Sequence, residues 1–304
     1  MRRPWFPALP ALLAAVLALA GVAALDPTPA AAQQSPRSAV FGGGPFYADG
    51  QAVMNTLRSS GFTTVILWSI HVRPNGDLYY NDVLIVSNGR YVGDAGWPAR
   101  LRTLKQAPTS VNRIEVSIGA WAVPDWENIA RLISSQGTGS SSILYRNFQA
   151  LKSATGADAI NNDDESFYQV GPTAAFARMA AGLGYSKFTF APYTNQSFWA
   201  SLRNNLGGAM VDRVYLQGYA GGAGNNPAAW NRALGMTVDP GLWSKHGSGC
   251  SAGDSPATVE SKMRSWRGSA GITGGFMWLY DDMKACSAQG TAAAYARAIR
   301  NGVS

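Results

Sequence analysis

A short stretch near the middle of the chain concentrates the groups that could do acid–base chemistry. Residues 157–165 read Ala-Asp-Ala-Ile-Asn-Asn-Asp-Asp-Glu, so four carboxyl groups and two amides occur within nine residues. We interpret the apolar start as a buried strand, on which Asn161, Asp163 and Glu165 share one face because strand side chains alternate. Two carboxylates about 6–7 Å apart repel by about 2.5 kcal/mol at an effective dielectric of about 20, which is about two pKa units. One carboxyl of this pair is therefore expected to keep its proton near neutral pH, as acid-catalysed bond cleavage requires.

Two other interpretations of the same stretch were weighed. An acidic run is often a solvated loop, and that alternative stays open on these residues alone. A calcium loop counted from Asn161 would place Ser166 where glycine is expected and Pro172 where the closing glutamate is expected. The calcium interpretation is therefore disfavoured.

The N-terminus has the pattern of a secretory signal peptide. Arg2 and Arg3 precede an apolar run over 8–25, and three alanines at 30–32 offer a cleavage site near Ala32. We predict that 1–32 is a signal peptide and that 33–304 is a secreted domain with no stable membrane insertion after cleavage. An uncleaved membrane anchor is the alternative.

Composition narrows the class of protein. A chain of 304 residues with 46% hydrophobic residues can bury a large core in one domain or two. Loss of Arg2, Arg3 and Asp26 with the signal peptide lowers the net charge from +7 to +6. The remaining basic residues are scattered without runs, which argues against nucleic-acid binding and leaves anionic cell-wall polymers possible.

The cysteines and histidines limit the chemistry further. In an exported protein, the only two cysteines, Cys250 and Cys286, suggest one disulfide. The only two histidines, His71 and His246, exclude a three-histidine zinc site. We expect no metal and no cofactor.

The hydrophobic pattern predicts alternating strands and helices. Eight strands alternate with about eight helices, a rhythm typical of a single (β/α)₈ TIM barrel. A doubly wound sheet is the alternative, but no glycine-rich phosphate motif follows the first strand. Asn-Gly pairs at 75–76 and 88–89 bracket a predicted β-hairpin inserted after the second strand. The strands are expected within 38–47, 63–68, 113–119, 157–165, 187–193, 212–219, 236–243 and 272–280.

In such a barrel the site lies at the carboxyl ends of the strands. Carboxylates, amides and aromatic rings gather at these ends, and aromatic faces beside hydrogen-bonding groups suit stacking against sugar rings. The alternative is that the aromatic rings only cap the core. The residues at these ends are Tyr47, Trp68, 117–121, Asp163, Glu165, Tyr193, Gln217, Tyr219, Trp243 and 278–282.

Four of these segments resemble family 18 glycoside hydrolases, the group of chitinases and endo-β-N-acetylglucosaminidases. The family's Asp-x-x-Asp-x-Asp-x-Glu signature is matched by Asp158, Asn161, Asp163 and Glu165, with asparagine in place of the middle aspartate. Residues 117–120 resemble its Ser-x-Gly-Gly signature, 217–219 its Gln-x-Tyr segment, and 276–282 the segment that carries the tryptophan below the sugar. These signatures occur in the family's order and span most of the mature chain.

The resemblance implies a retaining, substrate-assisted mechanism. Glu165 would protonate the glycosidic oxygen, while Asp163, helped by Tyr219, would orient the substrate's 2-acetamido group. The predicted substrate is β-1,4-linked N-acetylglucosamine, in chitin oligomers or in the N-glycan core. A carbohydrate-binding protein without catalysis is the alternative. The residues expected to bind the sugar are Asn161, Gln217, Trp278, Tyr193 and Trp121.

Three residues of the acidic segment depart from the family pattern. Asn161 removes a charge that would tune Asp163, and Asn162 replaces a residue that is usually apolar. Asp164 replaces a frequent aromatic residue, and Asp-Asp-Glu is more similar to the endo-β-N-acetylglucosaminidases.

A serine hydrolase is a further alternative, because residues 249–253 match the Gly-x-Ser-x-Gly motif of that class. However, no strand leads directly into these residues, and both histidines come earlier in the chain.

Overall fold

Parallel strands paired in a cycle form the centre of the protein. The computed structural model describes Met1, Trp5, residues 36–247 and residues 249–304. The pairing runs from β1 to β2, β6, β7 and β8, and from β9 to β10, β11 and back to β1. One parallel bridge between Phe190 and Val214 joins β8 to the residue before β9. These strands are β1 (Arg37–Gly42), β2 (Thr64–Val72), β6 (Arg113–Ile118), β7 (Ala159–Asn162), β8 (Lys187–Phe190), β9 (Tyr215–Gln217), β10 (Asp239–Trp243) and β11 (Gly274–Trp278).

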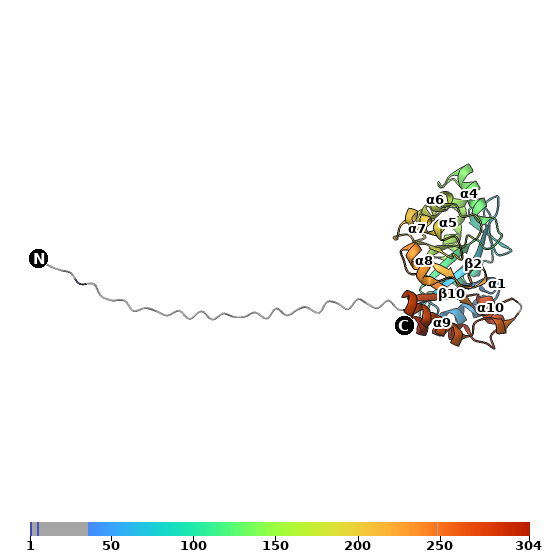
Figure 1. Cartoon of the computed structure of the whole chain (residues 1–304). Coiled ribbons are helices and arrows are strands. Elements are labelled where there is room, and N and C mark those ends of the chain that lie inside the picture. The colour runs from blue at the N-terminus through green and yellow to red at the C-terminus, as the bar shows by residue number, and fades with distance from the viewer. Residues whose placement is uncertain (2–4, 6–35, 248) are drawn as a thin grey trace. The chain divides into compact units, whose positions relative to one another are not determined.

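Helices follow most of these strands and pack around them (Figure 1). The contacts lead from α2 through α3, α5, α4, α6, α7, α8, α9 and α11 back to α2. Serine, threonine or asparagine side chains cap five of the helices at their N-termini, which satisfies backbone N–H groups that have no partner within the helix. The helices are α1 (Gly44–Ala48), α2 (Gly50–Ser60), α3 (Trp97–Thr103), α4 (Asp125–Gln136), α5 (Ile143–Thr155), α6 (Val170–Gly182), α7 (Gln196–Leu206), α8 (Pro227–Leu234), α9 (Pro256–Ala270), α10 (Tyr280–Ala285) and α11 (Ala292–Val303).

Three short antiparallel strands extend from β2. They are β3 (Leu78–Tyr80), β4 (Val83–Ser87) and β5 (Arg90–Tyr91), and β3 pairs with the second half of β2. Asn88 and Gly89, at φ 48° and 76°, form the turn between β4 and β5. The hydroxyl of Tyr80 donates to the carbonyls of Gly42 and Gly43, both at 2.8 Å, which fastens this extension to the end of β1.

The predicted α/β fold of the TIM-barrel type is confirmed, but several strands are shorter than expected. The strand expected over 63–68 is longer, because β2 continues past Trp68 to Val72, where it pairs with β3. The short strand expected within 38–47, before a glycine-rich turn, ends at Gly42. Helix α1 then begins at Gly44 with Pro45 in its first turn, so Tyr47 lies on this helix instead of at a strand end. The strand expected over 157–165 ends at Asn162, so Asp163 and Glu165 follow the strand. The predicted signal peptide falls on residues of which nearly all lie outside the described part of the chain.

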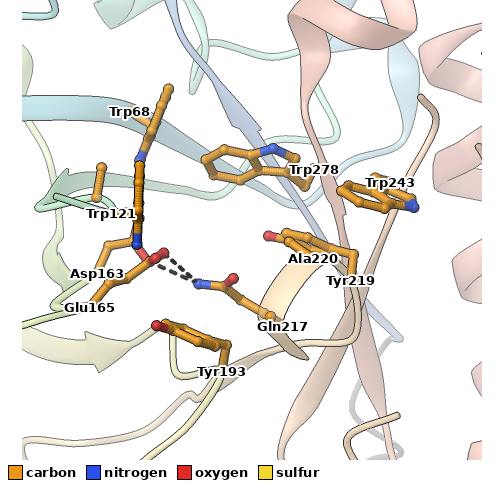
Figure 2. A pocket seen from close by; sticks show the side chains of 12 residues that line it. Trp68, Trp121, Asp163, Glu165, Tyr193, Gln217, Tyr219, Ala220, Trp243 and Trp278 are labelled. Carbon is orange, nitrogen blue, oxygen red and sulfur yellow. Dashed lines mark hydrogen bonds between the residues drawn. The ribbon is translucent and has the colours of Figure 1, made fainter. Parts of the chain in front are cut away.

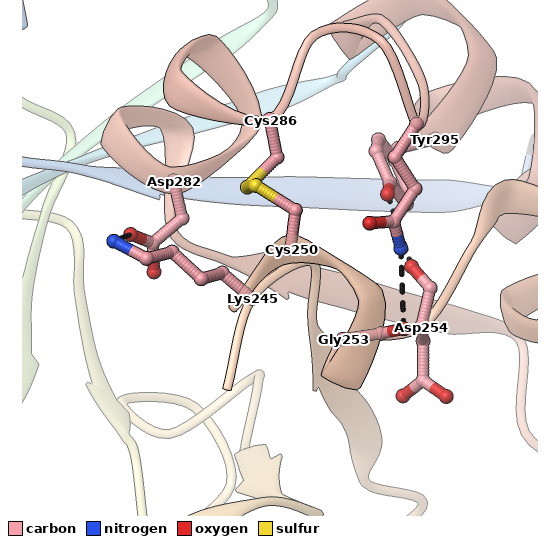
Figure 3. Close-up of a disulfide and its surroundings, with 8 residues drawn as sticks. Lys245, Cys250, Gly253, Asp254, Asp282, Cys286 and Tyr295 are labelled. Carbon is pink, nitrogen blue, oxygen red and sulfur yellow. Dashed lines mark hydrogen bonds and ion pairs between the residues drawn. A yellow bond between two sulfur atoms is a disulfide. The ribbon is translucent and has the colours of Figure 1, made fainter. Parts of the chain in front are cut away.

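The disulfide between Cys250 and Cys286 is formed (Figure 3). It joins the short 3₁₀-helix η2 (Cys250–Ala252) to the residue after α10, with 5.5 Å between the two Cα atoms. An ion pair at 3.6 Å links Lys245, which precedes η2, to Asp282 of α10. The serine of the Gly-x-Ser-x-Gly motif therefore lies on a 3₁₀ turn and not on the strand-to-helix turn that a nucleophile of that class requires.

Residues 36–304 form one compact unit, considered by itself. No helix in its described residues is long and apolar enough to cross a bilayer.

Candidate active site

A pocket of about 450 Å³ lies where the parallel strands end (Figure 2). Seven of the eight predicted catalytic and sugar-binding residues line it, and they come from five different strand ends or the loops that follow. The lining residues are Trp68, Ala120, Trp121, Asp163, Glu165, Tyr193, Gln217, Tyr219, Ala220, Gly221, Trp243 and Trp278.

The amide of Gln217 joins the two carboxyl groups. Its Nε2 atom donates to Asp163 Oδ1 at 3.2 Å and to Glu165 Oε1 at 3.1 Å, as Figure 2 shows, and it lies 3.0 Å from the carbonyl oxygen of Ala191. The indole Nε1 of Trp68 donates to the other oxygen of Asp163 at 3.0 Å. The two acids are thus held close together while both oxygens of Asp163 accept a hydrogen bond.

Burial and mutual repulsion favour a proton on this pair. Burial, followed by the charge of Glu165, raises the pKa of Asp163, and the hydrogen bonds from Trp68 and Gln217 oppose that rise. Burial also raises the pKa of Glu165, against the hydrogen bond from Gln217. Because the two groups interact closely, they titrate as a pair, with at least one proton retained to higher pH than an isolated carboxyl would allow.

Aromatic rings form one wall of the pocket. The ring of Tyr219 stacks between Trp243 and Trp278, with centroids 5.4 and 5.9 Å away and 27° between the planes in both cases. Trp278 meets the edge of Trp68 at 4.6 Å. Burial, followed by the charges of Asp163 and Glu165, raises the pKa of Tyr219 well above its ordinary value, so its hydroxyl remains a donor. Trp121 is 76% exposed at the opening.

Asn161 does not line the pocket, although the sequence predicted that it contacts the sugar. Its side chain is fully buried inside the ring of strands, where the hydroxyl of Ser117 donates to Oδ1 at 2.8 Å and Nδ2 donates to Thr189 at 3.0 Å. Thr189 in turn bonds to the buried carboxylate of Glu115. The strand continues regularly to Asn162 and therefore turns the Asn161 side chain inward, below Asp163.

Gly119 allows the loop after β6 to approach Asp163 closely. Its φ is +103°, and a Cβ atom at this position would lie 2.5 Å from the carbonyl oxygen of Asp163. Both conditions require glycine. This explains the glycine at the third position of the Ser-Ile-Gly-Ala segment in terms of backbone geometry.

Gly119→Ala is expected to destabilise the protein by about 2–5 kcal/mol, since positive φ and a steric clash add. Urea denaturation measures the free energy of unfolding. Gly207→Ala is the matched control, because its φ is +79° and no atom lies within 4 Å of the Cβ position. Equal losses in the two variants would show that the approach to Asp163 is not tight.

Trp68 and Trp243 were expected at strand ends but were not assigned to the site from sequence. Their position directly at the carboxyl end of a strand was the signal that could have assigned them. The carbonyl of Ala191 carried no such signal, because any residue supplies one. In the described part of the chain, no group of three or more histidine, cysteine, aspartate or glutamate side chains is placed to hold a metal ion.

The fold is similar to that of the catalytic domains of family 18 chitinases and endo-β-N-acetylglucosaminidases. The catalytic domain of a family 18 chitinase from the fern Peteris ryukyuensis has 17% sequence identity, covers 88% of this chain and 99% of its own, and gives a TM-score of 0.61. A fungal endo-β-N-acetylglucosaminidase of the same family has 16% identity, with coverage of 88% and 99% and a TM-score of 0.64.

A family 18 chitinase from Cycas revoluta, solved in complex with (GlcNAc)₃, has 12% identity, coverage of 88% and 100%, and a TM-score of 0.57. No family model matches the sequence, and no curated protein matches it. At these identities the likeness establishes the fold, and the chemistry must be argued from the site.

Proposed function

We propose that the protein is a glycoside hydrolase that cleaves β-1,4-linked N-acetylglucosamine with retention of configuration. The observation that carries the proposal is the Asp163–Glu165 pair, whose oxygens accept hydrogen bonds from one amide nitrogen in a pocket walled by aromatic rings. Aromatic faces stack on sugar rings, and the paired acids supply a proton and a negative charge at neighbouring positions. The similar folds of chitinases and endo-β-N-acetylglucosaminidases support the same class of reaction.

The proposed reaction uses the substrate's own acetamido group. Glu165 gives its proton to the glycosidic oxygen as the bond from that oxygen to the anomeric carbon breaks. The acetamido carbonyl oxygen forms a bond to the anomeric carbon, and Asp163 stabilises the positive oxazolinium ion, with Tyr219 as a further donor. Water then attacks the anomeric carbon as the bond from that carbon to the acetamido oxygen breaks, which restores the acetamido group, and the water gives a proton to Glu165. Two inversions give overall retention.

We also propose the wider organisation of the protein. Residues 33–304 would be a (β/α)₈ catalytic domain with an antiparallel insertion after its second strand, supported by the cyclic pairing and by the compact unit at 36–304. Residues 1–32 would direct secretion and then be removed. The disulfide of Cys250 and Cys286 supports an oxidising compartment.

The test is hydrolysis of chitotetraose and of a high-mannose asparagine-linked glycan by the purified mature protein. Cellotetraose is the matched control, since it has the same linkage but no acetamido group. We expect cleavage of at least one of the first two and none of cellotetraose. Binding of chitotetraose without cleavage of either glycan would favour the carbohydrate-binding alternative, and equal cleavage of cellotetraose would contradict the substrate-assisted step.

Trp68→Phe is expected to move the acidic limb of the kcat/KM profile to higher pH by about one unit. The hydrogen bond from Trp68 lowers the pKa of Asp163, and a hydrogen bond to a charged group is worth about 1.5–3 kcal/mol. Without that bond, Asp163 ionises at higher pH. Trp121→Phe, the same change at the exposed opening, should alter KM and leave the limb in place. An unmoved limb in Trp68→Phe would contradict this role.

A further inference from the structure

Asp164 is buried immediately beside the catalytic pair but does not line the pocket. Its Oδ1 atom accepts hydrogen bonds from the backbone N–H groups of Ser166 and Phe167, at 3.1 and 2.8 Å, and its Oδ2 atom accepts one from Tyr168 at 2.8 Å. Its own N–H donates to the side chain of Asn162 at 2.9 Å. The Asp164 side chain thus binds the backbone of residues 166–168, and Glu165 lies in the chain between Asp164 and that backbone.

The far end of the same loop is fixed by packing. The ring of Tyr168 meets Phe198 and Trp199 of α7 edge-on, with centroids 5.3 and 6.4 Å apart. The segment 164–168 is thus fastened at one end by a carboxylate and at the other by aromatic contacts. The backbone that carries Glu165 has little freedom to move relative to β7.

The hydrogen bonds of Asp164 favour its ionised form. Three backbone N–H groups donate to its two carboxyl oxygens, and such contacts stabilise the ionised form of a carboxyl group. Burial raises the pKa of Asp164, and these three bonds oppose the rise. The titratable groups that face it are acidic or neutral: Asp163, Glu165, the carboxyl of Glu127 on α4, and the hydroxyl of Tyr168.

We propose that Asp164 is a positioning residue that fixes the loop carrying Glu165 and that its buried negative charge helps Glu165 retain the proton it donates. The role of Glu165 as acid rests on the proposed function, whereas the effect of Asp164 on its protonation does not. The charge of Asp164 acts in the same direction on Asp163 and on Glu165, raising the pKa of each. An aromatic residue at this position could pack there but could supply neither the charge nor the three acceptor contacts.

The test is titration of Glu165 by NMR, with glutamate labelled at its side-chain carboxyl carbon. The chain has only four glutamates, so four signals are expected, and Glu165→Gln identifies the relevant one. In Asp164→Asn we expect the Glu165 midpoint to fall by about one pH unit, because a neighbouring negative charge is lost while the amide oxygen can still accept. The alkaline limb of the kcat/KM profile should move to lower pH by the same amount.

Two further variants make the result specific. Glu260→Gln removes one charge from the outer helix α9, where that carboxylate pairs with Arg264, and should leave the Glu165 midpoint unchanged. If Asp164→Asn does not fold, Asp164→Ser removes the charge and keeps a short acceptor. An unchanged Glu165 midpoint in the folded variant would overturn the proposal. A wild type that cleaves no glycan would overturn the proposed function alone, because the NMR titration does not require turnover.

Discussion

Glu165→Gln is expected to lower kcat on chitotetraose or on the N-glycan by about 10²–10⁴-fold, the usual contribution of a positioned general acid. Glutamine has nearly the same shape, and its amide oxygen can still accept the hydrogen bond from Gln217 that Glu165 accepts at 3.1 Å. The variant should therefore fold as the wild type does and bind the oligosaccharide with similar affinity. Only the proton for the leaving oxygen is missing.

Substrates with different leaving groups distinguish proton donation by Glu165 from other roles of this residue. An aryl N-acetylglucosaminide releases a phenolate that needs no proton, so the loss in Glu165→Gln should be much smaller on that substrate than on chitotetraose. Initial rates on both substrates, with melting temperature as the check on folding, give the comparison. Equal losses on the two would contradict a proton-donating role. The surface variant Glu260→Gln should retain full activity on both.

Much of the site could be predicted because the fold brings strand ends together. Trp68, Gln217 and Trp278 are far apart in sequence, but Gln217 and Trp278 end β9 and β11, and Trp68 follows the part of β2 that pairs with β1. The strands of such a fold all point the same way, so their carboxyl ends meet at one edge. Alternating hydrophobic segments were therefore enough to place these residues near one another before any side chain was positioned.

The details that decide the chemistry were not accessible from the pattern. The sequence placed Asn161 and Asp163 on the same face of one strand, but β7 ends at Asn162, so Asn161 points into the interior and Asp163 belongs to the following loop. The position of that end depends on the neighbouring strands, because the pairing of β7 with β6 and with β8 ends at Asn162 on both sides. The shared contact of Gln217 with both acids likewise depends on two loops that local sequence does not orient.

Asp164 illustrates the same point. In the sequence, Asp164 was only a departure from the family pattern, and the one inference from it was a similarity to the endo-β-N-acetylglucosaminidases. Its three backbone contacts become visible only once the loop 164–168 is in place. Sequence comparison alone describes Asp164 as a substitution for an aromatic residue. The structure shows that its side chain binds the backbone of the loop that carries Glu165.

Asp163→Asn is expected to lower kcat by about 10²–10³-fold, a loss typical of removing one preorganised stabilising group. Asparagine can still accept the hydrogen bond from Trp68, but its amide nitrogen then takes the place of Oδ1, so Gln217 Nε2 loses that acceptor and keeps its contacts with Glu165 and Ala191. What is lost is the negative charge beside the oxazolinium ion and the acceptor that orients the acetamido group. This loss affects bond formation to the anomeric carbon and not protonation of the leaving group.

The loss of activity should therefore depend on the leaving group in Glu165→Gln but not in Asp163→Asn. Asp163→Asn should lose activity to the same extent on chitotetraose and on an aryl N-acetylglucosaminide, because both need the acetamido group to attack. The proposed mechanism requires an ionised Asp163, so the acidic limb of kcat/KM should disappear, since asparagine does not titrate. The alkaline limb should move to lower pH, because the repulsion between the carboxyl groups of Asp163 and Glu165 acts on both and is lost in the variant, although the charge of Asp164 remains beside Glu165. A variant that retained the acidic limb, or recovered on the aryl substrate, would assign stabilisation of the intermediate to a residue other than Asp163.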